Sequence, residues 1–110
     1  MPLYMTQFSY KSDQVQGLVS NPQNRGEEAR KVIEAFGGTM HQFYYSLGEY
    51  DGVTIIEFPD QETATACIMA IVAAGAVSNI KTTPLLTMDE AVGAMQKASS
   101  VTSGYRPPVE

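Results

Sequence analysis

One stretch of the chain decides the fold, and it reads Leu47-Gly48-Glu49-Tyr50-Asp51-Gly52-Val53-Thr54-Ile55-Ile56-Glu57-Phe58-Pro59-Asp60. Asp51 and Gly52 both tolerate the positive φ angles of tight hairpin turns, so the pair predicts such a turn. The flanking segments, 39–46 and 53–58, are rich in β-branched and aromatic residues, which favours two paired strands. Pro59 cannot donate to a strand ladder and Asp60 is a good N-cap, so a helix should follow the second strand.

The residues before this hairpin predict one strand and two helical pieces. Residues 3–10 carry apolar groups on both faces, which indicates a strand in a sheet covered on both sides. A first short helix should begin at Ser12 or Asp13. Asn21 and Pro22 predict a second helix start, with Asn21 as N-cap and Pro22 in the first helical position. The apolar stripe of that helix precedes the stop signal Gly37-Gly38 and consists of Ala29, Val32, Ile33 and Phe36.

The residues after the hairpin predict a helix, a strand and a last short helix. The first helix should run from about Gln61 to Ala74 and end at Gly75. A fourth strand should span Val77 to Thr83, with Pro84 marking its end or a sheet edge. Thr87 and Glu90 have the spacing of a capping box. The helix that it opens has one apolar face, made of Ala91, Val92, Met95 and Ala98.

This order, βαββαβ with a short C-terminal helix, predicts an α+β ferredoxin-like sandwich with a four-stranded antiparallel sheet. Residues 1–98 should form a single domain, and residues 99–110 a flexible tail or an arm laid on a neighbouring copy. Two helices cover one sheet face, and the other face stays open although its residues are partly apolar. Such a face usually marks an interface or a ligand site, so we expect a homodimer or a higher homo-oligomer.

Composition narrows the function classes. The chain has 110 residues, of which 44% are hydrophobic and 17% charged, and its net charge is −5. This acidic balance argues against a nucleic-acid partner. The N-terminus shows no signal-peptide pattern, and the longest apolar tract, about residues 64–77, is too short for a bilayer. We therefore expect no membrane association and a cytoplasmic location.

Cys67 and His41 are each the only residue of their type. A lone cysteine cannot form an intramolecular disulfide or a cysteine-cluster metal site. Cys67 lies in an apolar helical stretch, so we expect a small buried hydrophobe rather than a reactive thiol. One histidine among scattered carboxylates does not predict a metal site, and Gly37-Gly38 follows a helix and is not a phosphate loop. No cofactor is expected.

Several of these segments together resemble the GYD-domain family, whose name refers to the turn motif, here Gly48-x-Tyr50-Asp51. The similarity extends over about residues 3–98, and the segments that carry it are 30–38, 43–44, 47–52, 57–60 and 75–82. The resemblance implies a ferredoxin-like fold related to dimeric α/β barrels. It implies no established reaction, because a fold alone does not confer function.

Any small-molecule site should lie beside the hairpin, where the polar candidates are His41, Tyr45, Tyr50 and Glu57. Strand alternation predicts that His41 and Tyr45 share a face while Tyr44 points the other way. The register, and hence the face of Glu57, is not fixed by a six-residue connection.

Each candidate also has a structural interpretation. His41 can be a surface residue, Glu57 a carboxylate near a strand end, and Tyr50-Asp51 a turn in which Asp51 bonds its own backbone. No catalytic motif is recognised. The sequence favours an oligomerising module that binds a small organic ligand. The alternative is a cofactor-independent enzyme that acts on a small organic substrate in a cleft between sheet and helices.

Overall fold

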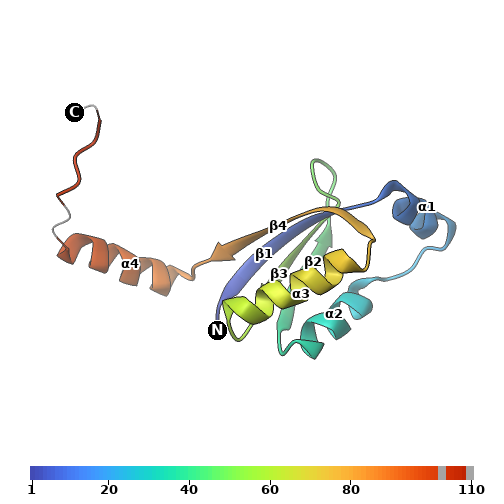
Figure 1. Cartoon of the computed structure of the whole chain (residues 1–110), viewed down its shortest axis with the longest axis horizontal. Coiled ribbons are helices and arrows are strands. Elements are labelled where there is room, and N and C mark those ends of the chain that lie inside the picture. The colour runs from blue at the N-terminus through green and yellow to red at the C-terminus, as the bar shows by residue number, and fades with distance from the viewer. Residues whose placement is uncertain (102–103, 109–110) are drawn as a thin grey trace.

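Four strands form one antiparallel sheet in the order β2-β3-β1-β4 in the computed structural model, which describes residues 1–101 and 104–108 (Figure 1). The strands are β1 (Leu3–Tyr10), β2 (Thr39–Tyr45), β3 (Gly52–Glu57) and β4 (Val77–Leu85). The helices are α1 (Ser12–Ser20), α2 (Gly26–Ala35), α3 (Gln61–Ala73) and α4 (Met88–Ser100). Because α2 and α3 lie over one sheet face, the predicted ferredoxin-like α+β fold is confirmed.

The core lies between the sheet and its two covering helices. Even-numbered residues of β1 and β3 point toward the helices and, except for the half-buried Tyr10, are buried, while odd-numbered residues face the open side and are half-buried. The buried apolar cluster combines side chains from both layers and consists of Tyr4, Ile33, Met40, Ile56, Phe58, Ala64 and Cys67. Cys67 is 0% exposed, which confirms the predicted buried hydrophobe.

The turn predicted at Asp51-Gly52 is wrong. Residues 46–51 connect β2 to β3, and Gly52 already belongs to β3. The glycine with positive φ in this connection is Gly48, at 148°, and no non-glycine residue in the described part of the chain has positive φ. The sequence signal misleads because β3 is a central strand whose first residue, Gly52, is paired with Phe8 of β1.

Asp51 extends the sheet instead of forming the turn. Its backbone N–H donates to Phe8 O at 2.8 Å, and its carbonyl accepts from Ser46 N at 2.8 Å. Its carboxylate accepts the backbone N–H of Tyr10 at 2.8 Å. Asp51 therefore bonds β1, and not its own backbone as predicted.

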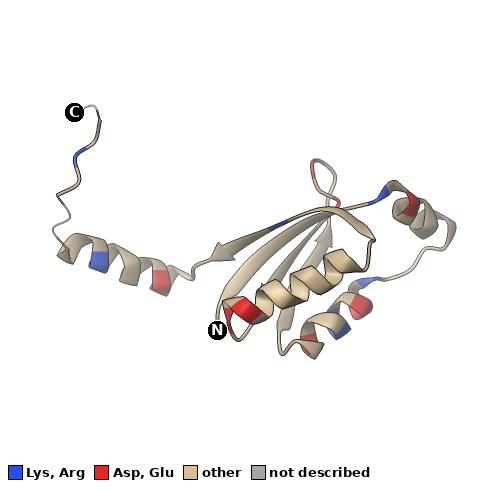
Figure 2. Ribbon diagram, viewed as in Figure 1, with Lys and Arg blue, Asp and Glu red and all other residues tan. Residues whose placement is uncertain are grey.

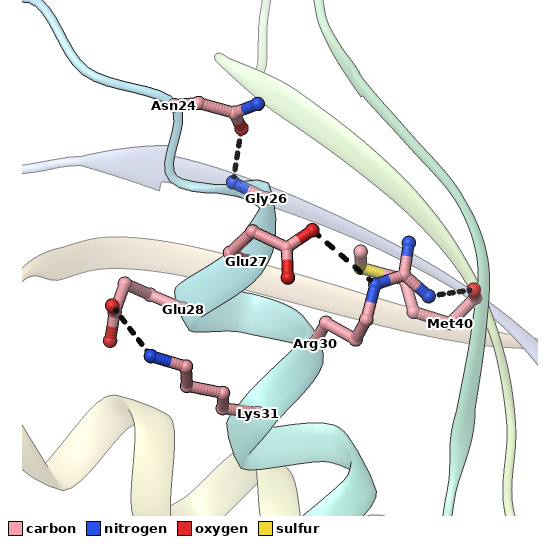
Figure 3. A network of polar contacts seen from close by, with 7 residues as sticks. All are labelled: Asn24, Gly26, Glu27, Glu28, Arg30, Lys31 and Met40. Carbon is pink, nitrogen blue, oxygen red and sulfur yellow. Dashed lines mark hydrogen bonds and ion pairs between the residues drawn. The ribbon is translucent and has the colours of Figure 1, made fainter.

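The helix start predicted at Asn21-Pro22 is also wrong. The backbone N–H of Asn21 donates to Gly17 O and ends α1, and α2 begins only at Gly26. The side-chain oxygen of Asn24 accepts the Gly26 N–H at 2.8 Å (Figure 3). An Asx-type bond from Asn24 thus satisfies one of the free donors of the helix end, which is the role predicted for Asn21.

The other predicted boundaries agree closely with the structure. Gly37 and Gly75 adopt positive φ after α2 and α3, and Pro84 lies in the edge strand β4. The capping box of Thr87 and Glu90 opens α4. Of the predicted tail 99–110, the first two residues belong to α4, and positions 102–103 and 109–110 lie outside the described residues. None of the helices in the described part of the chain has the length and hydropathy that crossing a membrane requires.

We predict that Gly52→Val destabilises the protein by about 1–3 kcal/mol, for a packing reason. A Cβ atom at Gly52 would lie 2.7 Å from Phe8 Cε1 and closer still to Cζ, and the Phe8 side chain is 8% exposed. The ring cannot move freely because it packs against Phe43 and Tyr10. Urea unfolding measures the loss.

The control variant lacks the Phe8 ring, which obstructs a side chain at position 52. On a Phe8→Ala background, Gly52→Val should cost much less, because the two sites are in contact and their effects couple. Equal costs on both backgrounds would refute the packing explanation.

Candidate functional site

A cavity of about 600 Å³ lies between the sheet and the helices. Phe8, Tyr10, Phe43 and Val77 line it from the sheet, and α1, α2, α3 and the segments next to them supply the remaining walls. The helical lining is largely apolar and includes Leu18, Ala29, Val32, Ala70 and Ile71. Volume and lining are typical of sites for small organic molecules.

Aromatic packing fixes the sheet side of the cavity. The Phe8 ring packs edge-to-face on Phe43, with centroids 5.7 Å apart at 90°, and on Tyr10 at 5.3 Å. Phe8 and Tyr10 are two residues apart on β1, so they share the helix-facing side. Since edge-to-face pairs hold both rings in a defined orientation, this surface is preorganised and apolar.

Two tyrosine hydroxyls meet beside the cavity. Tyr10 Oη and Tyr45 Oη are 3.3 Å apart, and their rings are tilted neighbours at 6.3 Å. Burial is the main cause that raises the pKa of Tyr10, and the hydrogen bond to Tyr45 raises it further, while the positive charge of Arg25 acts in the opposite direction. Tyr10 is therefore a neutral phenol at physiological pH and can donate or accept a hydrogen bond.

Charged groups border the cavity where α1 and α2 begin. Arg25 directly precedes α2, and its Nη1 donates to Gln23 Oε1 at 3.0 Å. Asp13 and Glu28 also line the cavity, so acidic and basic groups both surround it. Arg30 of α2 also contacts the sheet, because its Nη1 donates to the Met40 carbonyl at 3.4 Å (Figure 3).

His41 and Glu57, both predicted as site residues, lie together but outside this cavity. His41 Nε2 is 2.8 Å from Glu57 Oε1, and the two side chains are 44% and 30% exposed. Glu57 is an odd-numbered residue of β3 and faces the open side of the sheet. The pair therefore lies on the open face, and neither residue lines the cavity.

A β-bulge explains why the predicted alternation of β2 is wrong. Met40 pairs with Ile56 but Gln42 pairs with Ile55, so His41 is the extra residue. After the bulge the alternation is reversed, and Tyr45 joins Phe43 and Tyr10 on the helix-facing side. Tyr44 lies on the open face, where its hydroxyl donates to Gln42 Oε1 at 2.6 Å. His41 and Tyr45 therefore point to opposite sides.

The four predicted site residues do not converge. Tyr45 reaches the cavity border through Tyr10, His41 and Glu57 pair on the other face, and Tyr50 lies in the 46–51 connection. The carbonyl of Tyr50 accepts from Ser46 Oγ at 2.7 Å. A ligand-binding role for these residues stays a prediction.

Tyr10 and Arg25 were missed as site residues by the sequence reasoning. The even-numbered series Tyr4, Phe8, Tyr10 was a usable signal for Tyr10, because it marks the helix-facing side of β1. Arg25 carried no such signal, since its position depends on the irregular segment before α2. Within the described residues, no group of three or more His, Cys, Asp or Glu side chains could hold a metal ion.

Solved structures share this fold at low sequence identity. TTHA0845 from Thermus thermophilus is 16% identical with a TM-score of 0.55, and the match covers 79% of this chain and 95% of that one. MtbAldR is also 16% identical with a TM-score of 0.55, and the match covers 78% of this chain and 52% of that one. At3g17210 from Arabidopsis thaliana is 11% identical with a TM-score of 0.51, over 80% of this chain and 96% of that one. These similarities show the fold alone.

Among proteins with curated descriptions, none matches this sequence significantly. The family comparison is decisive, because the model of the GYD domain matches residues 4–95. That range runs from β1 into α4 and contains the sheet, the cavity and the His41–Glu57 pair. The chain therefore belongs to the GYD-domain family.

Proposed function

We propose that this protein is a homo-oligomeric module that binds a small, uncharged and largely apolar organic molecule between its sheet and its helices. The observation that carries the proposal is the cavity of about 600 Å³, lined mainly by apolar side chains and bordered by the Tyr10 hydroxyl. Pockets of this kind combine apolar walls with few polar groups that orient the ligand.

The polar groups at the cavity suit binding better than catalysis. Burial keeps Tyr10 protonated, so it offers a hydrogen bond rather than a base. The thiol of Cys67 does not line the cavity, and burial raises its pKa to about 11. Because Asp13, Arg25 and Glu28 present both signs of charge, the surroundings favour a neutral ligand.

Oligomerisation is supported by the open face of the sheet. This face carries half-buried apolar side chains on β1, β3 and β4, namely Leu3, Met5, Val53, Ile55 and Leu85, with Gln7 and Lys81 in the same row as Val53. Within the described chain no helix covers this face, and an exposed apolar patch on a folded protein usually marks an interface. A second copy presents the same surface and can cover it symmetrically.

The alternative function is that of a cofactor-independent enzyme, and the His41–Glu57 pair favours it. A carboxylate 2.8 Å from a ring nitrogen can orient the imidazole for acid–base catalysis. A second copy on the open face would also shield this pair from water. The pair lies at the end of β3, and neither residue lines the cavity, so this function would use a separate site.

We predict that neutral one-ring aromatic compounds bind the cavity with micromolar to millimolar affinity. Val32→Trp should abolish binding, because Val32 lines the cavity and the indole would fill it. Ala35→Trp is the matched control, since Ala35 is exposed on the same helix and does not line the cavity. Saturation-transfer NMR measures binding. Retained binding in Val32→Trp, or no binding to the parent protein at millimolar concentration, would contradict the proposed site.

We predict a dimer, or a multiple of it, at micromolar concentration. Light scattering should give at least twice the 11.9 kDa chain mass. Ile55→Lys should shift the mass toward the monomer, because it places a charge at the centre of the open face. Thr65→Lys, on the exposed side of α3, is the matched control and should leave the mass unchanged. A monomeric parent protein would refute this part of the proposal.

A further inference from the structure

The C-terminal helix α4 stands away from the rest of the fold. Figure 1 shows it beyond the end of the sheet, past the last residue of β4, and none of its residues is buried. The radius of gyration is 17.9 Å, whereas a compact chain of this length has one of about 13 Å. In this position α4 contributes little to the core of its own chain.

The exposed helix carries an apolar stripe. Met88, Val92 and Met95 are 77%, 49% and 66% exposed and, with Ala91, follow the i, i+3, i+4, i+7 spacing of one helix face. Leu86, just before the helix, is 60% exposed and extends the apolar surface. A helix with such a stripe normally buries it against another element, because most helical stability in proteins comes from this packing.

The connection between β4 and α4 is short. Residues 86–87 alone separate the strand from the helix. Thr87 is extended, and its side chain accepts the Glu90 N–H while the Glu90 carboxylate accepts the Thr87 N–H at 3.0 Å. This capping box holds Thr87 against the first turn of α4, so the helix is ordered from its first residue.

We propose that α4 is an arm that packs its Met88, Ala91, Val92 and Met95 stripe on a second copy of this chain. The inference rests on the homo-oligomer proposed above and extends its interface. Each copy has two uncovered apolar surfaces, the stripe on α4 and the open face of the sheet. A two-fold pair can bury both of them in one interface.

The area that a stable interface needs to bury favours a contact by the arm in addition to the sheet face. Four strands about 4.8 Å apart and about seven residues long give the open face a flat area of roughly 400 Å². Stable interfaces bury about 800 Å² on each partner. A helix of 13 residues is about 20 Å long and adds a second strip of contact. The sheet face and the arm together approach the area that a stable dimer needs.

The charge pattern agrees with an apolar contact rather than an ionic one. Figure 2 shows few charged positions on α4, and the charged residues, Asp89, Glu90 and Lys97, lie outside the stripe. Asp89 and Glu90 also belong to the first turn, where acidic residues stabilise a helix. The arm can therefore bury its stripe without burying a charge.

The test uses the full chain with neutral substitutions. Val92→Gln combined with Met95→Gln removes the apolar stripe, while glutamine keeps the helix propensity high. Ala94→Gln combined with Ser100→Gln is the matched control, at two exposed positions of α4 outside the stripe. Sedimentation velocity over a dilution series should show a dimer dissociation constant raised at least tenfold in the stripe variant and unchanged in the control.

The outcomes separate this inference from the proposed function. If the parent protein is dimeric and the stripe variant dimerises equally well, the arm is refuted while the module stands. If the parent protein is monomeric, the homo-oligomer proposed above is refuted as well as the arm. If the stripe variant is less stable to heat by the same amount at every protein concentration, α4 packs on its own chain and the proposed arm is refuted. Loss of dimer with concentration-dependent melting supports the arm.

Discussion

The absence of a side chain at Gly52 is the constraint on which the helix-facing side of the sheet depends. Phe8 occupies the space that a Cβ atom at Gly52 would fill. Phe8 then meets Phe43 and Tyr10 edge-to-face, and these three rings form the sheet side of the cavity. The neighbouring residue, Asp51, bonds the Phe8 carbonyl and the Tyr10 N–H and holds the same part of β1 in place. The missing side chain at Gly52 thus determines both the packing of these rings and the sheet side of the candidate site.

The element order could be predicted because periodicity and caps are local signals. The stripe of α2, the glycines after α2 and α3, and the capping box of α4 each act within a few residues. The errors concern residues whose partners are distant in sequence. Asp51 and Gly52 have good turn propensity, yet both are bound to β1, about forty positions away. Tertiary pairing overrode a local preference there.

The candidate site was predicted less well than the fold, for a related reason. Strand alternation holds along β1 for Phe8 and Tyr10, whereas one extra residue in β2 reverses the predicted side of Tyr45. The pairing of His41 with Glu57 needed the hairpin register, which a six-residue connection leaves open. The cavity itself needed the position of α1 and of the segment before α2, and neither follows from a sequence pattern.

The bulge at His41 also bears on how this family can change. Deleting that single residue would restore simple alternation in β2 without altering the chain's net charge. Gln42 to Tyr45 would keep their partners on β3, so the Tyr45 hydroxyl would stay beside Tyr10 and Tyr44 would stay on the open face. The imidazole that pairs with Glu57 would be lost. A length change at this position would therefore alter the external surface of the sheet and leave the internal site as it is.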